Sequence, residues 1–161
     1  MKRKLKILPG LLAALSLSWS ASVHALADCT VSASPTSFGI YSPFSISPLD
    51  GTGNVQVSCT LLDVVSLLVS YDILLSPGSS GTFANRTMIG GGYNLNYNLY
   101  TTAGRSSIWG DGSGGTSIVS DGYLLGLLTT VRNYTVYGRV MALQNVPPGP
   151  YSDTIVVTVN Y

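Results

Sequence analysis

The sequence lacks glutamate altogether, and charged residues make up only 9% of its 161 residues. All three lysines lie within the first six residues, and the single histidine is His24, so the chain beyond residue 24 has neither side chain. That long part therefore has no imidazole or amine for general-base, Schiff-base or histidine-ligated metal chemistry. We expect no enzyme, no cofactor and no metal site here, and the composition favours a binding or building protein.

The first 27 residues have the organisation of a secretory signal peptide. Basic residues at positions 2, 3, 4 and 6 precede an apolar, serine-dotted stretch over 7–23, which closes on Ala25-Leu26-Ala27. We predict cleavage between Ala27 and Asp28, which makes 1–27 the signal peptide and 28–161 one exported domain. That domain carries four arginines and seven aspartates. It has no basic patch, and we therefore expect no nucleic acid among its partners.

The two cysteines of the chain are Cys29 and Cys59. Export places them in an oxidising compartment, where two thiols have a single possible pairing. A zinc site would need four ligands, and the exported part offers no histidine. We predict one disulfide between Cys29 and Cys59, with two free thiols as the alternative.

Beyond Cys29 the sequence alternates between apolar and polar residues in short segments separated by glycine- and proline-rich turns. Period-two alternation of this kind is typical of β-strands with one buried face, and many short strands predict an all-β sandwich. The alternating apolar positions are Val55, Val57 and Cys59; Tyr71, Ile73 and Leu75; Leu95, Tyr97 and Leu99; Tyr134, Val136, Gly138 and Val140; and Ile155, Val157, Val159 and Tyr161.

Two segments, residues 61–69 and 123–128, are apolar at nearly every position. Periodicity does not distinguish a buried strand, a short helical turn and an exposed apolar loop in runs this short. The four arginines, Arg86, Arg105, Arg132 and Arg139, are scattered, and we expect them to be solvated or paired with aspartate. Trp109 and the tyrosines are expected mostly in the core or in cross-strand pairs, with stacking on sugars as the alternative.

The order of several short motifs resembles the spore coat protein U domain family. These motifs are Leu95-Asn96-Tyr97-Asn98-Leu99-Tyr100, Trp109-Gly110-Asp111-Gly112, Tyr137-Gly138-Arg139, and Gly149-Pro150-Tyr151-Ser152-Asp153 running into Val157-Thr158-Val159-Asn160-Tyr161. The resemblance covers essentially all of 28–161. It implies an immunoglobulin-like antiparallel sandwich that lacks its last strand, as in subunits of archaic chaperone–usher pili of Gram-negative bacteria.

The resemblance also implies partners and a binding site. A periplasmic chaperone would supply the missing strand first, and an N-terminal segment of a neighbouring pilus subunit would replace it during assembly at an outer-membrane usher. We expect the last apolar run to line the strand-acceptor groove, through Ile155, Val157, Val159 and Tyr161, because strand alternation places these side chains on one face.

We predict a secreted structural and adhesive pilus subunit at the fibre tip, reached through the periplasm and exposed at the cell surface. Only Asp28 precedes Cys29 after the predicted cleavage, so we expect no donor segment. The two apolar runs would then touch host or abiotic surfaces, through Leu61, Leu62, Val64, Val65, Leu67, Leu68, Tyr123, Leu124, Leu125, Leu127 and Leu128. The alternatives are a secreted spore-coat or matrix protein, and a secreted carbohydrate-binding module that uses tyrosines and Trp109.

Overall fold

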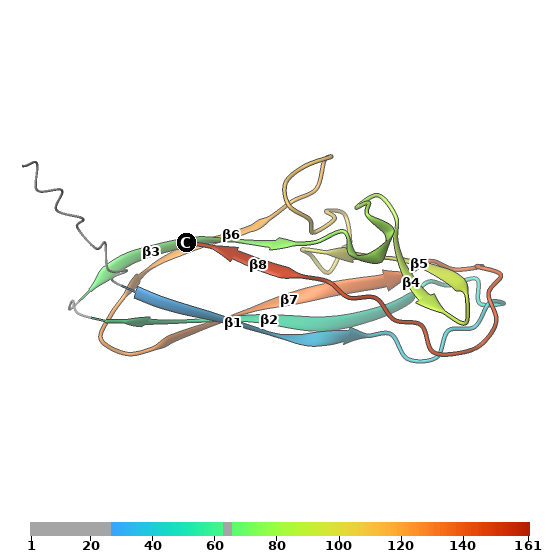
Figure 1. Cartoon of the computed structure of the whole chain (residues 1–161), viewed down its shortest axis with the longest axis horizontal. Helices are drawn as coiled ribbons and strands as arrows, with labels where there is room; N and C mark the ends of the chain where they lie inside the picture. Colours follow the sequence, from blue (N-terminus) through green and yellow to red (C-terminus); the bar gives the residue numbers. More distant parts are fainter. Residues whose placement is uncertain (1–26, 63–65) are drawn as a thin grey trace, which may run out of the picture.

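The computed structural model describes residues 27–62 and 66–161. Within these residues the chain forms eight β-strands and one short 3₁₀ helix (Figure 1). The predicted signal peptide falls on residues 1–26, outside the described part, except for Ala27, which begins the first strand. In chain order the elements are β1 (Ala27–Ser37), β2 (Leu49–Leu61), β3 (Leu67–Leu75), η1 (Gly78–Ser80), β4 (Arg86–Gly90), β5 (Tyr93–Tyr100), β6 (Val119–Leu125), β7 (Thr130–Val140) and β8 (Val157–Asn160).

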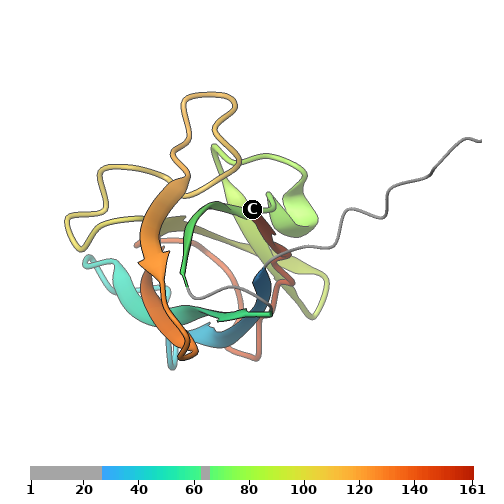
Figure 2. The same ribbon diagram turned by 90° about the vertical axis from the view of Figure 1, so that its left-hand side faces the viewer.

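The strands of the described residues form two antiparallel sheets. One has the order β1-β2-β7-β5-β4 and the other the order β6-β3-β8. Viewed end-on, the strands surround a common interior (Figure 2). This arrangement confirms the predicted all-β, immunoglobulin-like antiparallel sandwich. In the described part of the chain no helix is long and apolar enough to cross a membrane.

The core consists of the side chains that the alternation predicts to face inward. Val57, Cys59, Ile73 and Val140 are fully buried, as are most of their neighbours at every second position of β2, β3, β5 and β7. Successive side chains of a strand point to opposite faces, so one apolar residue in two is enough to fill the space between the sheets.

The last alternating run forms a shorter strand than the sequence predicts. Strand β8 begins at Val157 and pairs with β3, whereas Ser152 pairs with Ile89 of β4 in the other sheet. The chain crosses from one sheet to the other between these residues, so Ile155 and Val156 belong to no ladder. The alternation itself holds, since Ile155 and Val157 are partly buried and Val156 is 59% exposed.

Both apolar runs contain the ends of strands. Leu61 ends β2, Leu67 begins β3, and β6 ends at Leu125. Leu125 is fully buried, so the prediction that it belongs to an exposed adhesive loop is wrong. Strand β6 continues to this residue and turns its side chain toward the core. Val64 and Val65 lie outside the described residues.

Candidate functional site

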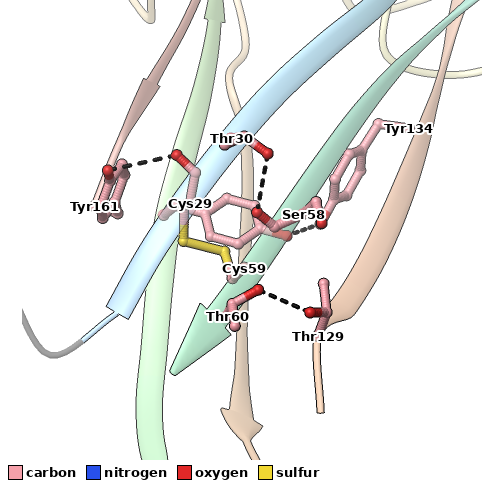
Figure 3. The surroundings of a disulfide bond; sticks show 9 residues. Cys29, Thr30, Ser58, Cys59, Thr60, Thr129, Tyr134 and Tyr161 are labelled. Atoms are coloured by element: carbon pink, nitrogen blue, oxygen red, sulfur yellow. Dashed lines mark hydrogen bonds between the residues drawn. A yellow bond between two sulfur atoms is a disulfide. The ribbon is translucent and has the colours of Figure 1, made fainter. Parts of the chain in front are cut away.

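The predicted disulfide is present and ties the outer strand β1 to β2 (Figure 3). Cys29 and Cys59 are directly opposite each other in the β1–β2 register. The Tyr161 hydroxyl, just after β8, donates a long hydrogen bond of 3.5 Å to the Cys29 carbonyl. At this end of the molecule the last residues of the chain therefore lie against β1.

Further along, β1 and the last segment of the chain move apart and leave a cavity of about 710 Å³. We call this cavity the edge groove; one side is residues 33–39 and the other is residues 149–157. Strands β1 and β8 are each the outer strand of their sheet among the described residues; the first side of the groove includes the end of β1, and the second side ends where β8 begins. Its floor is apolar and consists of Leu75, Met88, Leu95, Leu99, Val55, Val136 and Val140.

Side-chain and backbone hydrogen bonds fix the side of the edge groove formed by residues 149–157. Ser152 and Ile89 exchange two backbone hydrogen bonds, of 2.8 and 3.2 Å. Val156 is held by Ser76, whose backbone N–H donates to the Val156 carbonyl at 2.9 Å and whose hydroxyl accepts from the Val156 N–H at 2.9 Å. Between these anchors the chain is extended, and the backbone of Ile155 makes no hydrogen bond with any other described residue. Such a stretch can pair with an added strand.

Asp153 provides a third anchor on the same side. Its carboxylate accepts hydrogen bonds from the Ser79 N–H at 2.9 Å, the Ser79 hydroxyl at 2.6 Å and the Tyr97 hydroxyl at 2.7 Å. Burial raises the pKa of Tyr97 well above its usual value, and the adjacent carboxylate adds to this effect. The hydroxyl therefore stays protonated and holds Asp153 against the groove floor.

The structure separates the four residues that the sequence assigns to a strand-acceptor groove. Ile155 and Val157 line the edge groove. Val159 packs on the core but does not line the edge groove. Tyr161 is 64% exposed and lines a different hollow, beside Asp72. The groove thus lies nearer the start of the final run than predicted, because β8 closes toward β1 at its end.

Arg86 holds Ser76 in place, and this role differs from the predicted one. The side chain is fully buried, and its guanidinium donates at 2.8 and 3.2 Å to the Ser76 carbonyl, at 2.7 Å to the Trp109 carbonyl and at 2.8 Å to the Asn98 side chain. Burial lowers the pKa of this guanidinium from its very high usual value, and the group stays charged. It is neither solvated nor paired with an aspartate among the described residues. Its four hydrogen bonds, to two backbone carbonyls and one side-chain amide oxygen, replace those that the guanidinium would make with water.

The other three arginines behave as predicted. Arg105 and Arg139 both contact Asp50, at 3.3 and 2.7 Å, and the Arg139 guanidinium lowers the pKa of that carboxyl. Arg132 lies 3.9 Å from Asp121. The Arg132–Asp121 pair is a long contact at the surface, which contributes little to stability, whereas Asp50 accepts two hydrogen bonds from Arg139 and also contacts Arg105.

Five leucines of the predicted adhesive runs are well exposed at one end of the molecule. The ends of β2, β3 and β6 and the β6–β7 loop meet there, at the left of Figure 1. Leu68 and Leu124 are direct cross-strand partners, 74% and 70% exposed. We call this set the leucine end; it consists of Leu62, Leu68, Leu124, Leu127 and Leu128. Leu61, Leu67 and Tyr123 pack on the core instead.

A second apolar loop was not predicted. Between β1 and β2, at the opposite end of the molecule (Figure 1), Ile40, Phe44 and Ile46 are 94%, 89% and 83% exposed. The sequence signal was available, because these three residues stand among serine, glycine and proline residues, which are typical of a loop. The loop continues the side of the edge groove that begins at residue 33.

Trp109 is fully buried, and its indole N–H donates to the Ile73 carbonyl at 2.9 Å. It belongs to the core, as the sequence favours, and cannot stack on a sugar. Among the residues that the structure describes, no three His, Cys, Asp or Glu side chains gather to hold a metal ion.

Comparison with known proteins gives matches to a family, to a curated protein and to a solved structure. The family model of the Spore Coat Protein U domain matches residues 15–158. Protein U of Myxococcus xanthus is 35% identical over 131 residues, which are 77% of this chain and 70% of that protein. One solved structure that shares the fold is the chaperone–tip adhesion subunit pre-assembly complex CsuC–CsuE, from archaic chaperone–usher Csu pili of Acinetobacter baumannii. The match has a TM-score of 0.54 at 21% identity and covers 84% of this chain but only 40% of the matched chain.

Proposed function

Because this chain belongs to the spore coat protein U domain family, we propose that it is a secreted subunit of an archaic chaperone–usher pilus that accepts a donor strand in its edge groove. The observation that carries the proposal is the groove itself, an apolar cavity of about 710 Å³ between two sheet edges. An extended peptide there would pair with unbonded backbone and place alternate side chains on an apolar floor. The solved relative is itself a chaperone–subunit complex, which supports the same reading.

In this proposal the chain passes through the periplasm with a chaperone strand in the groove and exchanges it for the strand of a neighbouring subunit at an outer-membrane usher. The exchange needs no catalytic residue, since one strand replaces another on the same surface. Of the final apolar run, the incoming strand covers the side chains of Ile155 and Val157, together with the groove floor.

Charge substitutions at neighbouring positions test the groove. Val157 faces the groove, whereas Thr158 is exposed on the other face. With its cognate periplasmic chaperone co-expressed, Val157→Asp should lose the soluble complex and Thr158→Asp should keep it. Loss of one apolar contact is worth roughly 1.5–3 kcal/mol, or about ten- to a hundredfold in affinity, and a desolvated carboxylate adds to this. Equal capture of both variants, or a monomer that melts at high temperature and binds no chaperone, would contradict the proposal.

We place the subunit at the fibre tip, with the leucine end as the contact to host or abiotic surfaces. Five exposed leucines at one end of the sandwich, away from the Ile40 loop, support this placement. Leu127→Ser should assemble normally and adhere less to a hydrophobic surface, because Leu127 is 73% exposed. Leu125→Ser, at a fully buried position two residues earlier, should instead reduce the yield of folded subunit. Unchanged adhesion of Leu127→Ser fibres would remove the basis for the tip role.

A secreted coat or matrix protein is the second candidate. The specific observation in its favour is the identity of 35% to Protein U over most of that protein's length, compared with 21% to the pilus structure. Immunogold labelling separates the two, since a pilus subunit labels sheared fibres and a coat protein stays with the cell or spore surface.

A further inference from the structure

One region of the edge groove is already occupied by the chain itself. Three adjacent inward-facing positions carry no side chain: Gly51 and Gly53 on β2, and Gly138 on β7. Gly51 and Gly138 are direct partners in the β2–β7 register, and the neighbouring inward positions hold valines such as Val55 and Val140. The apolar inner surface of the sheet is therefore interrupted by a patch of bare backbone.

Residues 36–38 lie on this patch. A Cβ atom at Gly138 would come within 2.6 Å of the Phe38 ring and 2.7 Å of the Thr36 methyl group. One at Gly53 would come within 2.6 Å of the Thr36 hydroxyl, and one at Gly51 would collide with the Ser37 carbonyl. The β1–β2 register shifts between Ser34 and Ser37, which brings the chain inward over the sheet.

Phe38 then makes a contact that spans the groove. Its ring packs edge-on against Tyr97, with 5.9 Å between centroids, and the Tyr97 hydroxyl donates to Asp153 at 2.7 Å. Phe38 belongs to one side of the groove and Asp153 to the other, and all three residues line it. The line Phe38–Tyr97–Asp153 therefore crosses the groove from side to side.

We propose that Phe38, seated on Gly138, is a built-in substitute for one donor side chain and limits how long a strand the groove accepts. The inference rests on the proposed function, because it concerns the occupant of the same groove. An incoming strand places alternate side chains on the floor until it meets the Phe38 ring, where the apolar site is already filled. Phe38 thereby determines the length and register of the donor strand.

Peptide length gives a direct test with the purified full exported chain. The probes are fluorescein-labelled peptides of alternating valine and threonine, of about 6, 8, 10 and 12 residues, each residue adding about 3.3 Å. Binding is followed by fluorescence anisotropy. In the wild type, affinity should stop rising at an intermediate length. In Phe38→Ala the next added pair should tighten binding further by about tenfold, the effect of burying one more valine.

Gly138→Ala should also free the site that the Phe38 ring fills, because the new methyl group displaces the ring while Phe38 stays in the sequence. Gly104→Ala is the matched control, since nothing lies within 4 Å of its added Cβ, and it should behave as the wild type. A wild-type affinity that rises through the whole series overturns the proposal without any variant. So does a plateau at the same length in wild type, Phe38→Ala and Gly138→Ala. If none of the folded proteins binds any peptide, the groove is no strand acceptor and the proposed function itself fails.

Discussion

Replacing Arg86 by methionine should destabilise the protein and loosen the side of the edge groove formed by residues 149–157. The guanidinium is fully buried and donates to the Ser76 and Trp109 carbonyls and to the Asn98 side chain. Methionine keeps the length of the side chain but donates nothing. Asn98 retains a hydrogen bond from the Leu99 N–H, so the loss falls on the two carbonyls.

The magnitude follows from those two acceptors. A buried acceptor left without a partner costs about 1–3 kcal/mol, which gives about 2–6 kcal/mol for the pair. The variant no longer buries a charge, which offsets part of this cost, so we expect about 2–4 kcal/mol. Ser76 also holds Val156 through two hydrogen bonds of 2.9 Å, and its release should speed hydrogen exchange at the Val156 amide.

Urea unfolding of the oxidised protein measures the first effect and amide hydrogen exchange the second. Arg132→Met is the matched control, because that side chain is 48% exposed and lies 3.9 Å from its aspartate. It should change stability by less than about 1 kcal/mol. The loss of stability for Arg86→Lys should lie between those of Arg86→Met and Arg132→Met, since an ammonium group cannot reach all the acceptors of the planar guanidinium. A loss for Arg86→Met no larger than that of Arg132→Met would refute the anchoring role.

Three further predictions concern the fold. Replacing Cys29 and Cys59 together by alanine should cost roughly 3–4 kcal/mol in the chain-entropy model, measured by urea unfolding, whereas reducing agent should leave the variant unchanged. Trp109→Phe should cost about 2–4 kcal/mol and lower the melting temperature, because a buried carbonyl loses its indole donor and a small cavity forms. Burial and a carboxylate partner raise the pKa of Tyr134, so its contribution to stability is complete below about pH 10 and is lost at higher pH. Urea unfolding at pH 8 and pH 11 should show a lower stability at pH 11, and the difference between the two pH values should be smaller in Tyr134→Phe.

The strands and the disulfide could be predicted because each depends on a local or countable property. Val55, Val57 and Cys59 alternate with polar residues, and two cysteines allow one pairing. The place where the final run leaves one sheet for the other could not be read in the same way. It depends on the hydrogen bonds of Ser152 with Ile89 and of Val156 with Ser76, which join residues far apart in the sequence.

The site was only half predictable for the same reason. Alternation identifies Ile155 and Val157 as inward-facing, but it does not show where β1 separates from the last segment to leave a cavity. The sequence shows Arg86 only as a charged residue. It is buried because acceptors from three chain segments, at Ser76, Asn98 and Trp109, meet around its guanidinium. The prediction that Leu125 is exposed was wrong because an apolar run does not show which of its residues is the last to face the core.

The position of the disulfide has a mechanical consequence. In the proposed fibre, an inserted strand would carry tension along its length and pull on the sheet edges that flank it. Strand β1 flanks the edge groove and, among the described residues, is hydrogen-bonded on one side only, to β2. Hydrogen bonds at a strand's end break one after another when the strand is peeled, but the Cys29–Cys59 bond does not yield at such loads. Peeling that begins at the far end of β1 therefore stops at Cys29, and the strand can return to its register when the tension falls.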